Sequence, residues 1–353
     1  MSIGVHWVRN GKVVTMASPQ KNSFDLLRLF AATLVLYSHQ HSLLGLSEPD
    51  FFGWTTLGGI GVSIFFYLSG LLVWSSWARD PDLWRFFVKR SLRIFPALWV
   101  VVLLSALIVG PLLTSNEVSG YFASPVIWRY FGAAFFGTQN ELPGVFLNNP
   151  LPLVINGSLW TLRVEFLCYV SVAVIGSVRV IKQNRLVGLC LGCVVLCAAF
   201  GSQWIGSRFV PHFEMVAYFW WGVMYGYVSG RPVSEYKSWV PVIGINFFLF
   251  LCLGPHSIER TWVLLLAAAL VVIAQLTPWG SLLTDRLGDL SYGMYIFAFP
   301  VQQFIVEMGR SRDWAFSTHL TLSFFLTSVL AYVSWHVIEK RALRFKPSRE
   351  VVA

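Results

Sequence analysis

Apolar runs separated by short polar stretches recur along almost the whole chain. Ten of these runs are long enough to form helices that cross about 30 Å of hydrocarbon. They lie at residues 24–44, 57–77, 94–114, 156–178, 186–202, 212–229, 239–254, 261–278, 290–307 and 316–337. The pattern therefore predicts an all-α integral membrane protein, a bundle of about ten transmembrane helices.

The positive charges between these runs are distributed unevenly. If the helices alternate from a cytoplasmic N-terminus, nineteen Lys and Arg residues fall on inside segments and five on outside loops. Because Lys and Arg favour the cytoplasmic side, this asymmetry predicts an N-in, C-in protein. We expect a cytoplasmic N-terminal segment at 1–23, a transmembrane domain at 24–337 and a basic cytoplasmic tail at 338–353.

The composition supports a membrane protein. Of 353 residues, 56% are hydrophobic and 12% are charged. The mean hydropathy of +0.64 is too high for a soluble globular protein. The inside segments account for the net charge of +9, so no nucleic-acid partner is needed; membrane lipids or an anionic cytoplasmic ligand suffice. The polar start lacks the apolar run of a cleavable signal, so we expect it to be retained. The five cysteines form neither a disulfide framework nor a metal site.

Arg28 and His39 lie eleven residues apart inside the first apolar run. On a helix they would share nearly the same face, roughly 16 Å apart along the axis. Ionisable side chains in a membrane helix are costly and therefore mark candidate functional sites. The structural alternative is that Arg28 extends to the interface while His39 forms a hydrogen bond inside the bundle.

Arg90 and Arg93 belong to the densest positive cluster of the chain, WRFFVKRSLRIFPALW. In a helix they would be neighbours on one face, and their planar guanidinium groups suit bidentate recognition of phosphate. The alternative is that the cluster only orients the protein, since any cytoplasmic loop is enriched in Lys and Arg.

Glu165 is the one carboxylate within the ten apolar runs that lies away from their ends. Counting residues from each membrane surface places it within about 6 Å of the depth of His39. The two side chains could therefore meet. The alternative is that Glu165 is a structural ion-pair partner of Arg163 or Arg28.

Several of these residues fall in motifs that occur in order along the chain. They are FDLLRLFAATLVLYSHQH with Arg28 and His39, GGIGVSIFFYLSGLLVW with Ser69, Arg90-x-x-Arg93 before Ile-x-Pro, Trp160-Thr-Leu-x-x-Glu165, LSYGMYIFAFPVQQ with Tyr292, and WHVIEKRALRFK. Together they resemble the acyltransferase family 3 membrane proteins, which O-acylate glycans. The resemblance extends from about residue 24 to 346. Two positions depart from it: some members have His where Ala298 stands, and the closing motif usually has Pro where Arg341 stands.

The resemblance implies a stand-alone, multi-pass enzyme of the bacterial inner membrane. It would transfer acetyl from cytoplasmic acetyl-CoA, a co-substrate rather than a bound cofactor, to a hydroxyl of an exported or lipid-linked glycan. A sugar hydroxyl needs a positioned base, and we assign this role to His39, with Glu165 orienting it or stabilising the imidazolium. An acetyl-histidine intermediate is the covalent alternative to direct transfer. Arg28, Arg90 and Arg93 are assigned to binding of the acyl donor. Ser69, Trp160 and Tyr292 are candidate lining residues of the site.

Two questions stay open at this level. Embedded His, Arg and Glu residues also suit a proton-coupled transporter or a lipid-linked glycan flippase. The outside segment at about 115–155 contains aromatic residues that could stack on sugar rings, although an amphipathic helix at the membrane interface would contain them equally well. These aromatic residues are Trp128, Tyr130, Phe131, Phe135 and Phe136.

Overall fold

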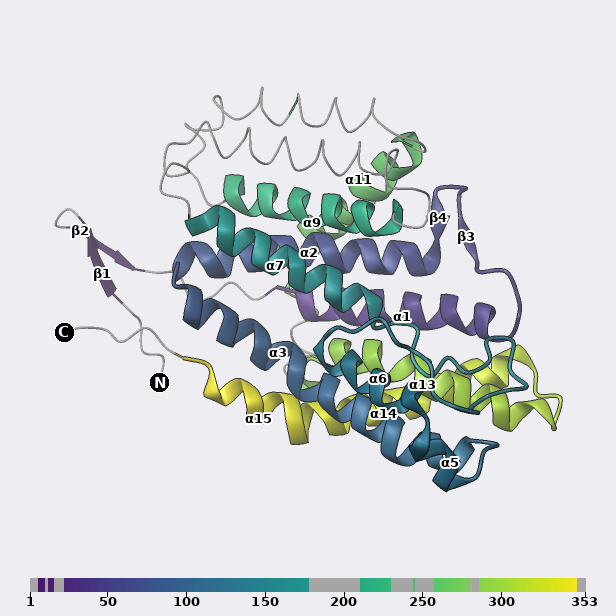
Figure 1. Cartoon of the computed structure of the whole chain (residues 1–353). Helices are drawn as coiled ribbons and strands as arrows, with labels where there is room; N and C mark the ends of the chain where they lie inside the picture. Colours follow the sequence, from purple (N-terminus) through teal and green to yellow (C-terminus); the bar gives the residue numbers. More distant parts are fainter. Residues whose placement is uncertain are drawn as a thin grey trace.

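The computed structural model describes residues 6–9, 12–15, 22–177, 210–229, 244, 257–278, 280 and 286–347. Eight long helices of this part of the chain lie side by side (Figure 1). They are α1 (Phe24–Leu43), α2 (Leu57–Arg79), α3 (Leu83–Leu104), α7 (Trp160–Ser177), α9 (Val210–Ser229), α11 (Ser257–Leu276), α13 (Ser291–Arg310) and α14 (Phe316–Ser334). The predicted helices at 186–202 and 239–254 lie outside the described residues, except for Gly244.

Two of these helices continue beyond their regular α-helical part. A π-helical turn, Ser105–Val109, joins α3 to α4 (Gly110–Leu113). Another π-helical turn, Trp335–Glu339, joins α14 to α15 (Lys340–Ala342) and a 3₁₀ turn, Leu343–Phe345. Such turns are frequent at functional sites.

Five helices of the described chain are long and apolar enough to cross a membrane. They are Leu57–Arg79, Leu83–Leu113, Trp160–Ser177, Ile258–Leu276 and Phe316–Phe345. The helices α1 and α13 are not among these five, and several of their polar side chains are buried: Ser38, Gln40, Gln302 and Gln303. The prediction of an all-α, multi-pass membrane protein is confirmed.

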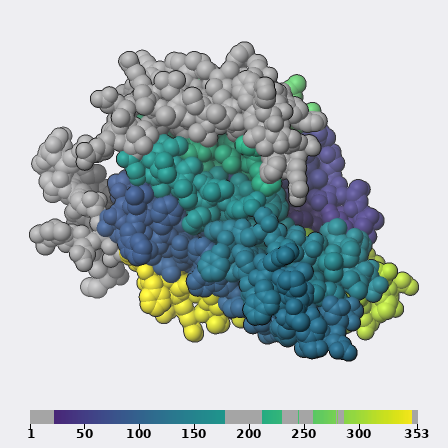
Figure 2. Space-filling model, viewed as in Figure 1, coloured from purple at the N-terminus to yellow at the C-terminus, as the bar shows by residue number. Residues whose placement is uncertain are grey.

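Short elements lie outside the long helices. Two antiparallel hairpins are present: β1 (His6–Arg9) with β2 (Lys12–Thr15), and β3 (Asp50–Phe51) with β4 (Thr55–Thr56). Between α4 and α7 the chain forms α5 (Val118–Ala123), α6 (Pro125–Tyr130) and a 3₁₀ turn, Phe131–Phe135. In Figure 2 this blue to teal segment covers the lower right of the visible face.

The third helix begins earlier than the hydropathy pattern indicates, and the fourth begins later. The third begins at residue 83 rather than 94, because Asp82 caps it by accepting a hydrogen bond from the Arg85 amide (2.8 Å). Its first turns are charged, so hydropathy alone excludes them. The fourth begins at 160 rather than 156, because Asn156 holds a turn by accepting from the Ser158 amide (3.1 Å).

Contacts between the helices give their relative directions. The helices α1 and α13 run in parallel, because Arg28 contacts Asp289 at one end and Gln302 donates to Gln40 at the other. We call the end with Arg28 the basic end and the opposite end, with His39, the histidine end. The helices α2 and α14 run from the histidine end to the basic end, which lies at the left in Figure 1.

The glycines at the start of α2 allow close helix packing. A Cβ atom on Gly61 would lie 2.5 Å from the Ala31 carbonyl oxygen of α1. On Gly58 it would lie 2.9 Å from the Cβ of Ser38. Larger side chains would push α1 and α2 apart and would displace the turn of α1 that carries His39.

Candidate active site

A cavity of about 550 Å³ extends from the basic end into the bundle. Six predicted site residues line it: Arg28, Ser69, Arg90, Arg93, Glu165 and Tyr292. Further cationic side chains surround them, namely Arg79, Lys89, Arg286, Lys340 and Lys346. The fold therefore brings these sequence-predicted positions, which are spread over more than 260 residues, into one basic cavity.

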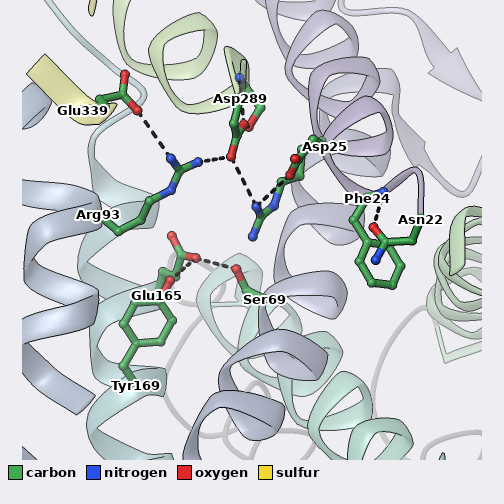
Figure 3. A network of polar contacts seen from close by, with 11 residues as sticks. Asn22, Phe24, Asp25, Ser69, Arg93, Glu165, Tyr169, Asp289 and Glu339 are labelled. Atoms are coloured by element: carbon green, nitrogen blue, oxygen red, sulfur yellow. Dashed lines mark hydrogen bonds and ion pairs between the residues drawn. The ribbon is translucent and has the colours of Figure 1, made fainter. Parts of the chain in front are cut away.

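Arg93 is held by two carboxylates. Its Nη2 lies 2.5 Å from the Asp289 Oδ2, and its Nη1 lies 3.5 Å from the Glu339 Oε2 (Figure 3). Its guanidinium also lies over the ring of Tyr292, 5.7 Å from the centroid. Because Glu339 is only 2% exposed, these contacts form a buried ionic network joining α3, α13 and the end of α14.

Arg28 joins the same network. Its Nη1 lies 3.5 Å from the Asp289 Oδ2 and 3.6 Å from the Asp25 Oδ1. Asp289 precedes α13, and its other oxygen accepts a hydrogen bond from the Ser291 hydroxyl (2.5 Å). Burial alone would raise the pKa of Asp289, but Arg93 and Arg28 hold it below its ordinary value. The charges of Arg28 and Arg93 are thus largely compensated by protein carboxylates.

Arg90 differs from its neighbour one turn away. Its Nη2 donates to the neutral hydroxyl of Ser76 (3.3 Å), while its buried Nε has no partner among the described residues. The guanidinium lies over the rings of Phe86 and Tyr169, at 6.0 and 5.9 Å from their centroids. No carboxylate of the described residues forms an ion pair with it. Arg90 therefore keeps both charge and donors available for an anion in the cavity.

Glu165 lies farther inside the cavity. Its Oε1 accepts hydrogen bonds from the Ser69 hydroxyl (2.6 Å) and the Tyr169 hydroxyl (2.5 Å), as Figure 3 shows. In the described part of the chain it forms no ion pair with Arg163 or Arg28, the structural partners considered above. The arrangement places a carboxylate and two hydroxyls together within a cavity whose mouth is basic.

His39 does not line this cavity. Its ring packs edge-on against Phe299 with centroids 5.4 Å apart, and its Nδ1 is buried without a hydrogen-bond partner among the described residues. Within the same residues no contact joins it to Glu165. The predicted meeting of these two side chains is therefore not seen, and their catalytic roles stay predictions.

The distance between the cavity and His39 is nevertheless short. Val62 of α2 and Tyr295 of α13 line the cavity, and each lies four residues from a residue at the histidine end, Gly58 or Phe299. Four residues correspond to about 6 Å along a helix. One helical turn of protein therefore separates the cavity from the surroundings of His39.

The remaining predicted positions have structural surroundings of their own. Trp160 is half-exposed and packs on the ring of His212 (4.7 Å between centroids), outside the cavity. Tyr292 lines the cavity and donates to the Ile94 carbonyl (2.8 Å). His41 faces another side of α1 than His39 and packs on Phe316, with centroids 4.4 Å apart.

The aromatic residues of the 115–155 segment do not line the cavity. Tyr130 is fully buried, and Phe136 packs on Phe166 (4.9 Å between centroids). Trp128 and Phe135 are 66% and 71% exposed. This distribution fits short helices that pack beside α3 with part of their surface toward lipid or the interface.

Sequence reasoning missed three acidic residues that the structure brings into contact with these groups. Asp289 and Glu339 hold Arg93, and Glu48 contacts the turn of α1 that carries His39. Asp289 directly precedes one closing motif and Glu339 lies within the other, so their position was a usable signal. No pattern marks Glu48, which lies in a short loop. In the described chain, no group of three or more His, Cys, Asp or Glu side chains is placed to hold a metal ion.

Comparison with known proteins identifies the family. Residues 21–336 match the model of an acyltransferase domain family. An O-acetyl transferase of Shigella phage Sf6 is 32% identical and aligns over 92% of this chain and 96% of its own. Nodulation protein 10 of Rhizobium leguminosarum bv. viciae is 30% identical over 94% of this chain and 96% of its own.

More distant relatives point the same way. The exopolysaccharide production protein ExoZ of Rhizobium meliloti is 24% identical over 84% of this chain and 93% of its own. No solved structure matches the chain. The ordered motifs, the basic cavity and the match over nearly the whole transmembrane domain agree, and the chain belongs to this acyltransferase family and is an acyltransferase.

Proposed function

We propose that this protein transfers acetyl from acetyl-CoA to a hydroxyl group of an exported or lipid-linked glycan, in the bacterial inner membrane. The observation that carries the proposal is Arg90, a guanidinium with unused donors in a basic cavity of about 550 Å³. The phosphates of a coenzyme A thioester are suitable partners for such a site, since planar guanidinium groups bind phosphate in a bidentate manner.

The direction of the cavity supports a cytoplasmic donor. Many of the described Lys and Arg side chains line the cavity at the basic end, and since Lys and Arg favour the cytoplasmic side, the cavity mouth would face the cytoplasm. From the mouth, the cavity reaches inward past Ser69 and Glu165 to Tyr295. The phosphates would bind near Arg90, and the acetyl thioester would extend past these side chains toward the histidine end.

His39 is the base in this proposal. A glycan hydroxyl is a poor nucleophile at neutral pH and needs a positioned base, and an imidazole without a committed Nδ1 partner can supply one. The acceptor would approach from the histidine end, and the thioester from the cavity. Glu165 would hold the hydroxyls of Ser69 and Tyr169 along the path of the thioester.

The names of the relatives support the acetyl group and the acceptor class. The phage relative is named an O-acetyl transferase, and the Rhizobium meliloti relative is named for exopolysaccharide production. A peptidoglycan O-acetyltransferase, OatA of Listeria monocytogenes, aligns with 54% of this chain at 25% identity. A transporter or flippase function has no comparable support, because the matching family is one of acyltransferases.

The test uses inverted and right-side-out membrane vesicles supplied with acetyl-labelled acetyl-CoA. We expect label to enter glycan only in inverted vesicles, whose cytoplasmic face is accessible, and only with active protein. Equal incorporation with the His39→Ala protein, or none with the wild type across surface glycans of the host, would reject the proposal.

The orientation can be tested separately with single cysteines. In a variant that lacks the five native cysteines, a cysteine introduced at Asp82 should react only with membrane-permeant reagents in intact cells. Labelling by an impermeant reagent from the periplasm would place the basic cavity on the wrong side for cytoplasmic acetyl-CoA.

A further inference from the structure

Glu48 lies in the loop between α1 and β3, and its side chain folds back onto α1. Its Oε2 accepts a hydrogen bond from the Ser38 hydroxyl (2.5 Å), and its Oε1 accepts one from the Ser42 hydroxyl (2.6 Å). These serines precede His39 by one residue and follow it by three. Both oxygens of the carboxylate are thus fixed against the helical turn that carries His39.

The local fold is built to admit this carboxylate. Gly58, the second residue of α2, faces the Ser38–Glu48 contact, and a Cβ there would lie 2.9 Å from the Ser38 Cβ and 3.6 Å from the Glu48 Oε2. Thr56 caps α2 by accepting from the Gly59 amide (3.1 Å), which fixes the return of the loop. The glycine and the cap together keep Glu48 between the ends of α1 and α2.

Glu48 is stabilised in its ionised form. Partial burial by itself would raise its pKa, but the hydrogen bonds from Ser38 and Ser42 and the adjacent His39 lower the pKa below its ordinary value. A fixed negative charge therefore lies against the turn of α1 that carries His39, an imidazole whose buried Nδ1 has no hydrogen-bond partner among the described residues.

Glu165 is less well placed than Glu48 to stabilise a protonated His39. Its hydrogen bonds go to Ser69 and Tyr169, and it lines the basic cavity, which His39 does not. A base that takes up a proton inside an apolar bundle becomes a cation, and burying it without a nearby anion is costly. Glu48 is the carboxylate fixed against the turn of α1 that carries His39.

We propose that Glu48 is the acidic positioning residue of His39. The inference rests on the acetyl transfer proposed above. As the acceptor oxygen attacks the acetyl carbonyl carbon, its proton moves to His39, a C–O bond forms and the C–S bond of the thioester breaks. Glu48 stabilises the resulting imidazolium. The proton then passes to the departing thiolate, which leaves as the thiol of coenzyme A and restores neutral His39.

The experiment compares Glu48→Gln and Glu48→Asp with the matched control Asp50→Asn. Gln keeps an acceptor for a serine but removes the charge, whereas Asp keeps the charge on a shorter side chain. Asp50 lies in the same loop, is exposed, and accepts a hydrogen bond from the Gly53 amide (2.5 Å). The readouts are kcat, KM for acetyl-CoA, acetyl-CoA binding and the melting temperature, all on the full chain in detergent.

We expect Glu48→Gln to lower kcat about a hundredfold, with KM and affinity for acetyl-CoA within twofold of the wild type. The donor site is at the basic end, so a change at Glu48 should not reach it. Glu48→Asp should recover part of kcat, and Asp50→Asn should keep wild-type values. A purely structural role would instead lower the melting temperature and donor binding together.

Three outcomes would overturn the inference. Unchanged kcat in Glu48→Gln, with an active wild type, rejects Glu48 alone and leaves the acetyl transfer standing. Parallel loss of kcat, donor binding and melting temperature in both Glu48 variants assigns the residue to folding. An inactive wild type rejects the proposed function and this inference with it.

Discussion

The two ends of the bundle differ in whether their ionisable side chains have partners. At the basic end, Arg28 and Arg93 share Asp289, and Glu339 completes the set, so most of the buried charge is compensated within the protein. At the histidine end, His39 packs on Phe299 and has one buried nitrogen without a partner among the described residues. The comparison indicates that charge at the basic end links the helices, whereas the histidine end leaves one imidazole nitrogen without a hydrogen-bond partner among the described residues.

A similar contrast exists within the basic end itself. Arg90 and Arg93 are one helical turn apart and belong to the same sequence motif, yet Arg93 has two carboxylate partners and Arg90 has a single neutral one. Equal spacing and equal chemistry in the sequence therefore give two different roles. The following experiments test this division.

The largest effect should come from His39→Ala. We expect acetyl transfer to fall by about three orders of magnitude, since loss of a general base costs roughly 10²- to 10⁴-fold, while the amount of protein in the membrane stays normal. His41→Ala is the matched control, because His41 packs elsewhere, on Phe316. Equal losses in both variants would favour a local folding defect of α1 and would remove the contrast between the two ends.

Arg93→Ala should mainly cost stability. It would leave the buried Glu339 without its arginine and Asp289 with Arg28 alone, and loss of one partner of a buried ion pair typically destabilises by about 3 kcal/mol. The measurement is the melting temperature in detergent, compared with that of Arg90→Ala, which breaks no ion pair and should melt near the wild type. If both variants melt alike, the ionic network does not organise the helices.

Arg90→Lys should mainly cost donor binding. The charge is kept, but Lys lacks the planar fork, so we expect affinity for acetyl-CoA to fall roughly tenfold. Binding should be measured at raised salt with a competing polyphosphate, because exposed cationic surfaces bind many anions weakly. An unchanged affinity would mean that diffuse charge, rather than this guanidinium, attracts the donor.

The smallest expected change in stability comes from a substitution at Asp80. Its carboxylate accepts hydrogen bonds from Arg85 (2.8 Å) and Lys89 (2.7 Å) at the start of α3. These partners hold its pKa well below the ordinary value of 3.8. The stabilisation, about 1 kcal/mol for partly exposed partners, is therefore complete above pH 3.8 and is lost as the pH falls through the folded-state pKa. Asp80→Asn should melt below the wild type at pH 7, and the difference should shrink in strong acid. A constant difference would contradict this origin.

Several features of the fold could be predicted from the sequence because they depend on neighbouring residues. Runs of apolar side chains predicted the described long helices. The start of α3 was wrong by eleven residues, since its first turns are charged and are begun by the side chain of Asp82. A cap of this kind depends on one hydrogen bond, and average hydropathy does not report it.

The candidate site could likewise be predicted only in part from the sequence. The motifs predicted that Arg28, Arg90, Arg93, Glu165, Ser69 and Tyr292 belong to one site, and in the structure all six line one cavity. The pairing of His39 with Glu165 was predicted from membrane depth alone. Depth places two side chains at one level of the membrane, but it does not say which faces of two helices meet.

The sequence by itself determined the membrane class and the family, because hydropathy and motif order are properties of short segments. Only the tertiary structure decided the partners. Arg93 meets acids 196 and 246 residues away, and this contact leaves Arg90 available to a ligand. Glu48 reaches the turn of His39 because a glycine on another helix makes room for it. Such contacts depend on which helices become neighbours, and no short segment of the chain contains that information.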